Sequence, residues 1–344
     1  MQASQPPPLP PPPPPPSPLH LRYWREEGMP QAFQDFLSSL PSEEGLITTS
    51  ARSYQGFWFS SCWILKAVLT CQNHFQAHPS DVLLVTSPKS GTTWLKAILF
   101  ALVNRAKYPD SSSQRPHPLL TQNPHDLVPS LEVKLYLEEE NPNLAALAPP
   151  RLFATHMPYS LLPQSVRDSN CKLVYLCRNP KDTFISLWHF VNKLRPEEKG
   201  QIPIQECLDQ FCRGVSPCGP YWDHVLGYHK ASLEMPEKVL FMTYEQMKVD
   251  PHVQVRRLAD FLGCPFGEEE LRDGMAEGIL RMCSFENLSA LEVNKSGKLS
   301  TGVENNWFFR RGEVGDWANY MSAEMGERID GVMEEKLHGS GLKL

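Results

Sequence analysis

Short apolar runs alternate with segments of helical periodicity through most of the chain. Residues 92–102 carry apolar side chains at the three-to-four spacing of one helix face, namely Leu95, Ile98, Leu99 and Leu102. The apolar runs are each short enough for one buried strand, and helical patterns follow most of them; they are residues 82–85, 152–154, 173–177 and 239–242. Because strands that alternate with helices form parallel sheets, the pattern predicts a single α/β domain with a central parallel sheet flanked by helices.

Three segments depart from this alternation. Residues 23–36 have the pattern of a polar helix, and the aromatic-rich segment 54–77 is expected to cover the core. Residues 108–150 are rich in Ser, Pro, Asn and Glu with few periodic signals. We therefore expect them to form a long surface excursion, of a size typical of lids and specificity elements.

Composition limits the class of protein. The 344 residues, of which 41% are hydrophobic, can bury the core of one large domain. The net charge of −6 argues against a nucleic-acid partner. Nine scattered cysteines without a C-x-x-C pair indicate reduced thiols in a cytoplasmic setting, and argue against a zinc site or a disulfide framework. The apolar window 57–69 is too short to span a bilayer and contains Lys66, so no membrane anchor is expected.

The amino-terminal segment is a proline tract without the apolar core of a signal peptide. Residues 6–18 are proline except for Leu9 and Ser17, which favours extended polyproline II and no packed core. We interpret residues 1–20 as a disordered proline-rich arm without a dedicated partner, and residues 21–344 as the folded domain. Docking of the arm to an SH3-like or profilin-like protein is the alternative.

Residues 88–94, with the sequence PKSGTTW, connect the first apolar run to the helix expected from Thr92. The unpaired N–H groups and positive dipole end of a helix start attract anions, and Gly91 allows the backbone to come close. A Walker loop has Lys-[Ser/Thr] after its last glycine, whereas here Lys89 precedes Gly91. The pattern predicts a phosphate-binding loop that differs from the nucleotide P-loop; the alternative is a turn that caps the helix and binds nothing.

Residues with titratable or charged side chains follow the other apolar runs. Parallel sheets bind ligands beyond the carboxyl ends of their strands. His156 follows the second run and can take a proton near neutral pH, although it is one of 11 histidines. Arg178 follows the third run, and its guanidinium could clamp a phosphate together with Ser186. Arg178 could equally be a structural residue paired with Asp182. Tyr244 follows the fourth run.

A further cationic segment lies near the carboxyl end. Residues 308–317 have the sequence FFRRGEVGDW, with Arg310, Arg311 and Gly312 in succession. Two adjacent cations and a glycine suit phosphate binding. A solvated basic turn would leave the flanking aromatic residues without an explanation.

Together these segments resemble the cytosolic sulfotransferases, which use 3′-phosphoadenosine 5′-phosphosulfate (PAPS) as sulfuryl donor. The resemblance extends from about residue 22 to the end of the chain and is strongest to the plant branch, such as the flavonol sulfotransferases. It implies a single α/β domain with a central parallel sheet and a P-loop-like phosphosulfate-binding loop at residues 88–94. It also implies PAPS as co-substrate, 3′,5′-ADP as product and no metal.

The resemblance also implies roles for individual residues. His156, in Thr-His-Met-Pro, stands at the position of the catalytic base, and Lys89 acts at the leaving phosphate. The donor-binding residues that match the family are Lys89, Ser90, Gly91, Thr92, Thr93, Trp94, Arg178, Ser186, Tyr244, Arg310, Arg311 and Gly312. Among these, Arg178 and Ser186 match 3′-phosphate ligands. Trp94 and Tyr244 match residues at the adenine, which Phe285 could join.

Three positions depart from the animal members of the family. Ala154 stands where many of them have a lysine two residues before the histidine. Arg311 replaces a lysine, which keeps the charge but changes its geometry. Of the animal dimer element only Glu327 remains, because other residues stand at the remaining positions: Ala318, Ser322 and Ala323. We therefore expect a monomer or a weak dimer.

The sequence thus predicts a cytoplasmic, PAPS-dependent sulfotransferase that acts by in-line transfer on a small hydroxylated acceptor. A flavonoid or other phenol is the first expectation, and a steroid, hydroxyjasmonate or desulfoglucosinolate is possible. Two alternatives remain open. One is a P-loop nucleotide kinase that uses the Lys89 loop, and the other is a non-catalytic interaction protein that acts through the proline-rich arm.

Overall fold

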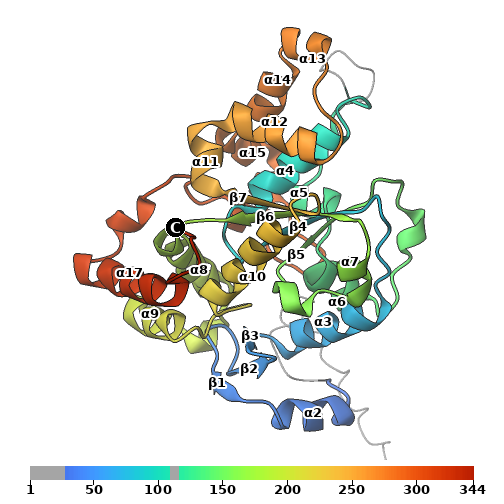
Figure 1. Ribbon diagram of the computed structural model, residues 1–344. Helices are drawn as coiled ribbons and strands as arrows, with labels where there is room; N and C mark the ends of the chain where they lie inside the picture. Colours follow the sequence, from blue (N-terminus) through green and yellow to red (C-terminus); the bar gives the residue numbers. More distant parts are fainter. Residues whose placement is uncertain (1–27, 109–115) are drawn as a thin grey trace, which may run out of the picture.

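A four-stranded parallel sheet forms the centre of the molecule (Figure 1). The structure is a computed structural model that describes residues 28–108 and 116–344. The strands lie in the order β5-β4-β6-β7, and all neighbours are parallel. Their bounds are Val82–Thr86 for β4, Leu152–Thr155 for β5, Lys172–Cys177 for β6 and Val239–Thr243 for β7. The predicted sheet is therefore confirmed, and the expected strand ends are correct to within one residue.

The strands alternate their side chains between two apolar cores. In β4, Leu83 and Val85 enter the core on one face, whereas Val82 and Leu84 enter the core on the other. Because successive side chains of a strand point to opposite faces, a sheet that is covered twice needs apolar residues at nearly every position. All residues of β4 are buried accordingly.

Helices cover both faces of the sheet, as expected (Figure 1). Above the sheet in this view lie α4 (Thr92–Val103), α11 (Tyr244–Val249), α12 (Pro251–Phe261), α14 (Met275–Met282) and α15 (Phe285–Ala290). The other core is covered by α3 (Cys62–His74), α7 (Gln164–Asp168), α8 (Pro180–Leu194), α9 (Ile204–Cys212), α10 (Tyr221–Glu234) and α17 (Ala323–Leu337). The two helical layers cover the faces of the sheet and not the ends of its strands.

Shorter helices complete the described chain. The α-helical ones are α2 (Gln31–Ser38), α5 (Pro124–Leu127), α6 (Tyr136–Glu138), α13 (Glu268–Arg272) and α16 (Glu292–Ser296). The 3₁₀ turns are η1 (Pro118–Leu120), η3 (Leu144–Ala146), η4 (Tyr159–Leu161), η5 (Glu197–Lys199), η6 (Asn305–Phe308) and η7 (Asp316–Asn319), and η2 (Leu131–Leu135) is a π-helical turn.

The start of α8 is set by its sequence. The side chain of Asn179 caps the helix by accepting hydrogen bonds from the N–H groups of Lys181 (3.0 Å) and Asp182 (3.4 Å). Pro180 occupies the first turn, where no N–H is needed. The helix therefore begins immediately after Arg178 and holds that residue at the sheet edge.

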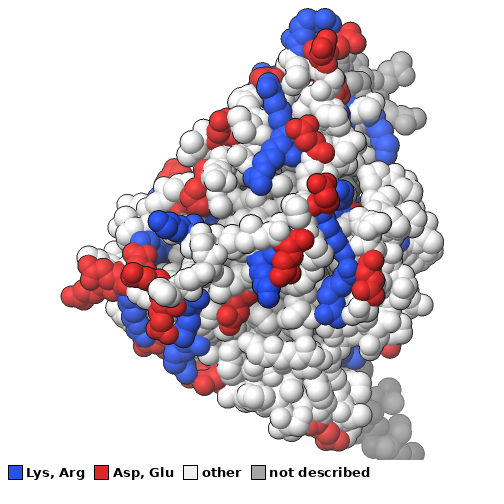
Figure 2. Space-filling model, viewed as in Figure 1, with Lys and Arg blue, Asp and Glu red and all other residues white. Residues whose placement is uncertain are grey.

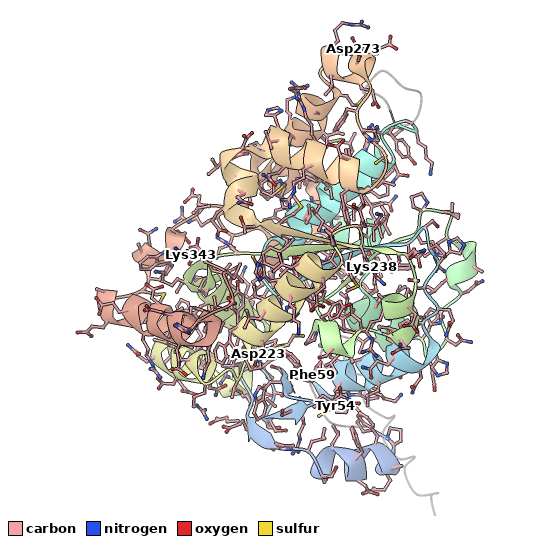
Figure 3. All side chains as sticks on the ribbon, in the orientation of Figure 1. Tyr54, Phe59, Asp223, Lys238, Asp273 and Lys343 are labelled. Carbon is pink, nitrogen blue, oxygen red and sulfur yellow. The ribbon has the colours of Figure 1, made fainter. Side chains whose placement is uncertain are left out.

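A small antiparallel sheet precedes the main sheet and was not expected. It consists of β1 (Ser42–Glu44), β2 (Ser50–Tyr54) and β3 (Phe57–Phe59), in the order β1-β2-β3. Between β2 and β3, Gln55 and Gly56 both have positive φ, of 49° and 85°, as a two-residue hairpin turn requires. The hairpin directs Phe59 into the core that α3 covers, near Tyr54 on the neighbouring strand (Figure 3).

Two expectations about irregular segments were partly wrong. Of the polar helix expected over residues 23–36, residues 28–30 are not helical, because Gly28 takes a left-handed φ of 79° and Pro30 precedes α2, which starts at Gln31; residues 23–27 lie outside the described residues. Within the segment expected to be a surface excursion, Leu119, Val128 and Leu131 are fully buried. Their short helices carry too few residues to show a period in the sequence.

The surface view shows charges of both signs side by side. On the face drawn in Figure 2, blue and red groups alternate over the helices. Within residues 28–108 and 116–344, no helix combines the length and apolar character needed to cross a membrane. The arm at residues 1–20 lies outside the described residues.

Replacement of a buried strand residue tests how much packing on the two faces of the sheet contributes to the stability of the protein. Leu84→Ala should lower the free energy of unfolding by about 2–5 kcal/mol, because the Leu84 side chain is fully buried in the central strand. Leu233→Ala, on the exposed face of α10, serves as control and should change it by less than about 0.5 kcal/mol. Urea denaturation followed by tryptophan fluorescence measures both, and equal effects would contradict this account of the core.

Candidate active site

A cavity of about 480 Å³ lies beyond the carboxyl ends of the central strands. It is lined by residues that follow each of the four strands: the loop after β4, His156 after β5, Arg178 after β6 and Tyr244 after β7. The lining includes all but one of the residues expected at the site: Lys89, Gly91, Thr92, Thr93, Trp94, His156, Arg178, Ser186, Tyr244, Arg310, Arg311 and Gly312. Ser90 lies in the same loop but is buried and outside this lining.

Lys89 has an unusual backbone and an unusual environment. Its φ of 71° is left-handed, a conformation that costs a residue with a side chain about 1–2 kcal/mol. Its Nζ lies 3.9 Å from the centroid of the Phe190 ring. Burial lowers the pKa of Lys89 to about 7, with further lowering by the nearby charges of Lys193, Arg310 and Arg178. An anion that enters the cavity would therefore stabilise the charged form of Lys89.

Arg178 is fixed from several sides. Its guanidinium lies over the Tyr244 ring, with its central carbon 4.5 Å from the ring centroid, and donates to the carbonyl of Glu313 (2.6 Å). The hydroxyl of Tyr221 donates to the backbone carbonyl of Arg178. Asp182 lies 3.6 Å away, so the structural pairing expected as an alternative is present. It does not use the whole guanidinium, because Nε of Arg178 has no hydrogen-bond partner among the described residues.

Asp182 attaches the carboxyl-terminal loop to the site. This fully buried carboxylate accepts hydrogen bonds from the N–H groups of Gly315 (2.8 Å) and Trp317 (3.0 Å). The loop brings Arg310, which forms an ion pair with Asp316. Residues more than 130 positions apart in sequence thus meet at one cavity wall.

Two glycines allow close packing around Tyr244. A Cβ atom at Gly91 would lie 2.8 Å from the Tyr244 ring, and one at Gly312 would lie 2.7 Å from the Phe285 ring. Both glycines have positive φ, of 107° and 70°. The Tyr244 hydroxyl donates to the carbonyl of Gly312 (2.8 Å), and the Trp94 ring meets the Tyr244 ring edge-on at 5.4 Å.

Three buried polar atoms of these segments are suited to binding an anion. Ser90 Oγ, Arg178 Nε and Arg310 Nε are buried and, within the described chain, make no hydrogen bond. A buried polar group without a partner costs about 1–3 kcal/mol. All three belong to segments expected to hold phosphate or sulfonate groups, so the donor set fits a polyanionic nucleotide.

His156 is held with one ring nitrogen available. Its Nδ1 lies 2.8 Å from the carbonyl oxygen of Thr86, which cannot donate, so the ring proton is on Nδ1. The backbone N–H of His156 donates to Glu132 (2.6 Å), and its carbonyl accepts from His224 (3.0 Å). Burial lowers the pKa of His156, partly offset by Glu132 and the Thr86 hydrogen bond. A neutral ring with an unprotonated Nε2 is the form that can accept a proton.

Comparison with known proteins decides the family. A sulfotransferase domain matches residues 79–341 of the chain. The chain belongs to the sulfotransferase family. Cytosolic sulfotransferase 12 of Arabidopsis thaliana is 50% identical to it over 322 residues, which cover 93% of this chain and 96% of the relative.

Solved sulfotransferase structures share the fold. The crystal structure of an Arabidopsis thaliana sulphotransferase superposes with a TM-score of 0.74 at 43% identity, over 94% of this chain and 98% of that chain. Mouse sulfotransferase SULT7A1, complexed with PAP, gives a TM-score of 0.65 at 26% identity, over 84% and 95% of the two chains. The plant cytosolic sulfotransferase resemblance and the α/β fold expected from the sequence are confirmed, and the names of the Arabidopsis relatives support a cytoplasmic location.

Sequence reasoning missed several residues that shape the sulfotransferase cavity. His125, Phe190 and Lys193 line it, and Glu132 and Lys96 are buried behind it. A signal existed for Lys96, the sole charged residue of the apolar helix α4. No comparable signal marked Glu132, which lies in a segment without periodicity.

Loss of the Asp182 carboxylate should loosen the carboxyl-terminal loop. Gly315 and Trp317 each donate to one carboxylate oxygen of Asp182, and Asp182→Asn replaces one of these two oxygens by an NH₂ group. One backbone N–H then faces a donor, and a buried N–H without a partner is costly. We expect faster hydrogen exchange at residues 310–317, measured by mass spectrometry. Asp330→Asn is the control, because Asp330 is exposed and pairs with Lys181 on the surface. Unchanged exchange in Asp182→Asn would contradict the attachment.

Proposed function

We propose that this sulfotransferase moves a sulfuryl group from PAPS to a hydroxyl of a small acceptor, with His156 as the base. The observation that carries the proposal is the meeting of Lys89, Arg178 and Arg310 in one cavity with the free nitrogen of His156. These three cations suit a nucleotide that carries phosphate at two ends, and Glu286 is an acidic residue that also lines the cavity.

The donor would lie along the wall formed by the loop after β4, the start of α8 and the carboxyl-terminal loop. PAP, bound in the mouse relative, is the 3′,5′-ADP that remains after sulfuryl transfer from PAPS. Residues 89–93 would bind the 5′-phosphosulfate at the start of α4. The 3′-phosphate would meet Arg178, Ser186 and the loop that carries Arg310, Arg311 and Gly312, and the adenine would meet Trp94 and Tyr244.

The transfer needs one proton acceptor and one stabilised leaving group. As the acceptor oxygen bonds to sulfur, its proton passes to Nε2 of His156, and the bond between sulfur and the 5′-phosphate oxygen breaks. The phosphate leaves with that electron pair, and the ammonium of Lys89 offsets its charge. Because this charge grows during the reaction, Lys89 would stabilise the transition state more than the bound donor.

The remaining cavity wall favours an apolar acceptor. It contains side chains from β3, η2, α6, the segment before η6 and η6 itself, including Phe59, Val133, Leu137, Val303 and Trp307. Apolar and aromatic walls suit flat hydrophobic molecules. A flavonol or other phenol is the first candidate, ahead of a steroid, hydroxyjasmonate or desulfoglucosinolate.

An acceptor panel with labelled PAPS tests the proposed reaction. We expect sulfated product from a hydroxylated acceptor without added metal, and a rise in melting temperature with 3′,5′-ADP. A kinase acting through the Lys89 loop would instead be stabilised by ATP–Mg²⁺ and would transfer phosphate. Stabilisation by ATP–Mg²⁺ but not by 3′,5′-ADP would sink the proposal.

Removal of the His156 imidazole should lower turnover without weakening the binding of 3′,5′-ADP. His156→Ala should retain 3′,5′-ADP affinity while kcat falls about 10²–10⁴-fold, the usual contribution of a positioned base. His252→Ala, whose side chain is solvent-accessible at the start of α12, should keep both values. Calorimetry and steady-state assays measure them. Near wild-type kcat in His156→Ala would remove His156 from the role.

A further inference from the structure

Three hydrogen-bonded side chains run from the interior of α4 to the cavity wall. Nζ of Lys96 lies 3.2 Å from Nδ1 of His125 and 3.0 Å from Oγ of Ser130. Nε2 of His125 lies 2.9 Å from Oγ1 of Thr93. Thr93 and His125 line the cavity, whereas Lys96 is fully buried. We call Lys96, His125 and Thr93 the α4 relay.

Protonated Lys96 fixes the direction of each hydrogen bond in the α4 relay. An ammonium group has only donors, so Nδ1 of His125 must be the acceptor. The neutral imidazole then carries its proton on Nε2 and donates it to Oγ1 of Thr93. The hydroxyl hydrogen of Thr93 is left free for the cavity. Thr92 differs, because its hydroxyl bonds to that of Thr86 at 2.7 Å.

The imidazole of His125 is kept neutral and in place. Burial holds the pKa of His125 well below its usual range, and the charges of Lys96, His156, Lys89 and Lys134 lower it further. Its ring packs against the ring of Phe308, with the centroids 4.1 Å apart. A second proton on this ring would face the ammonium of Lys96, so the neutral form is the one that fits.

Lys96 is a buried cation without a direct ion pair in the described chain. Burial lowers the pKa of Lys96 to about 7; Glu132 and Asp126 act to raise it and Lys134 to lower it. Its polar contacts are with His125 and Ser130. An apolar residue of similar length would avoid the cost of burying a charge here, so the lysine calls for a role beyond packing.

We propose that Lys96 and His125 are positioning residues that turn the Thr93 hydroxyl into a hydrogen-bond donor for an oxygen of the sulfated nucleotide. This inference rests on the proposed function, because the anion is the PAPS donor. Thr93 lies in the first turn of α4, where backbone N–H groups also lack helical partners, so hydroxyl and backbone can bind the same anionic group.

The α4 relay can also reverse. Neutral Lys96 has a lone pair and can accept a hydrogen bond from Nδ1 of His125. Nε2 then accepts the hydroxyl hydrogen of Thr93, and the oxygen lone pairs face the cavity. Lone pairs repel an anion, so loss of the Lys96 proton weakens donor binding at Thr93.

A double-mutant cycle tests the α4 relay. The enzymes are wild type, Lys96→Met, Thr93→Val and the double variant, with kcat/KM for PAPS measured at saturating acceptor and pH 6.5. Each single variant should lose about ten- to hundredfold, as for a hydrogen bond to a charged group, and Lys96→Met should cost nothing further in Thr93→Val. Thr93→Ser restores the hydroxyl and should recover most of the kcat/KM that Thr93→Val loses. Equal losses from Lys96→Met in both backgrounds would overturn the proposal.

A second variant covers the case in which Lys96→Met does not fold, which circular dichroism and thermal unfolding show. His125→Phe keeps a ring against Phe308 but removes both nitrogens. It should lower kcat/KM in the wild type and have no effect in Thr93→Val. The same loss in both backgrounds would mean that His125 acts only through packing.

The pH dependence of kcat/KM separates the α4 relay from a role in packing alone, because an effect of packing would not change with the protonation of Lys96. The ratio of kcat/KM between wild type and Thr93→Val should shrink as pH rises through about 7, where Lys96 loses its proton. A ratio that is constant from pH 6 to 9 would contradict the reversal. Failure of the α4 relay leaves wild-type turnover of PAPS intact, whereas an enzyme that neither binds 3′,5′-ADP nor uses PAPS refutes the proposed function itself.

Discussion

Positive charge concentrated in a partly closed cavity is the constraint on which the site depends. Burial, followed by the nearby charges of Lys193, Arg310 and Arg178, lowers the pKa of Lys89 to about 7. The folded protein bears this repulsion together with a left-handed Lys89 backbone and buried donors that lack partners. Such strain persists where a ligand relieves it, and a nucleotide with anionic groups at both ends would do so.

The fold holds these cations against their repulsion through acids placed on the outer side. Asp182 fixes the carboxyl-terminal loop through two backbone N–H groups, and Asp316 pairs with Arg310. Neither carboxylate is among the residues that line the cavity. The acids therefore anchor the loop and partly balance the charge, while the cavity itself stays positive. Glu286 of α15 is an acidic residue on the lining, where the cations Lys89, Arg178 and Arg310 outnumber it.

The part of the site that the sequence predicted is the part that follows from strand order. A four-residue apolar run such as residues 82–85 predicts a buried strand. Parallel strands end on one side of the sheet, so Lys89, His156 and Arg178 were expected to meet. The loop with Arg310 depended on the family resemblance, because no local pattern shows that Asp182 accepts its N–H groups. Glu132 and His125 were missed since their short helices pack by tertiary contact alone, without a period to read.

The buried polar groups behind the cavity place a cation beside β5. Ala154 lies on β5, the strand that precedes His156. Here Ala154 forms a parallel bridge with Ser130, and Lys96 reaches Ser130 from α4 on the same face of the sheet. A cation thus lies beside this strand although it comes from another element. A buried charge needs polar partners at hydrogen-bond distance, so the buried ammonium of Lys96 requires Ser130 and His125. We expect a substitution of one of these residues to be tolerated only together with substitutions of the others.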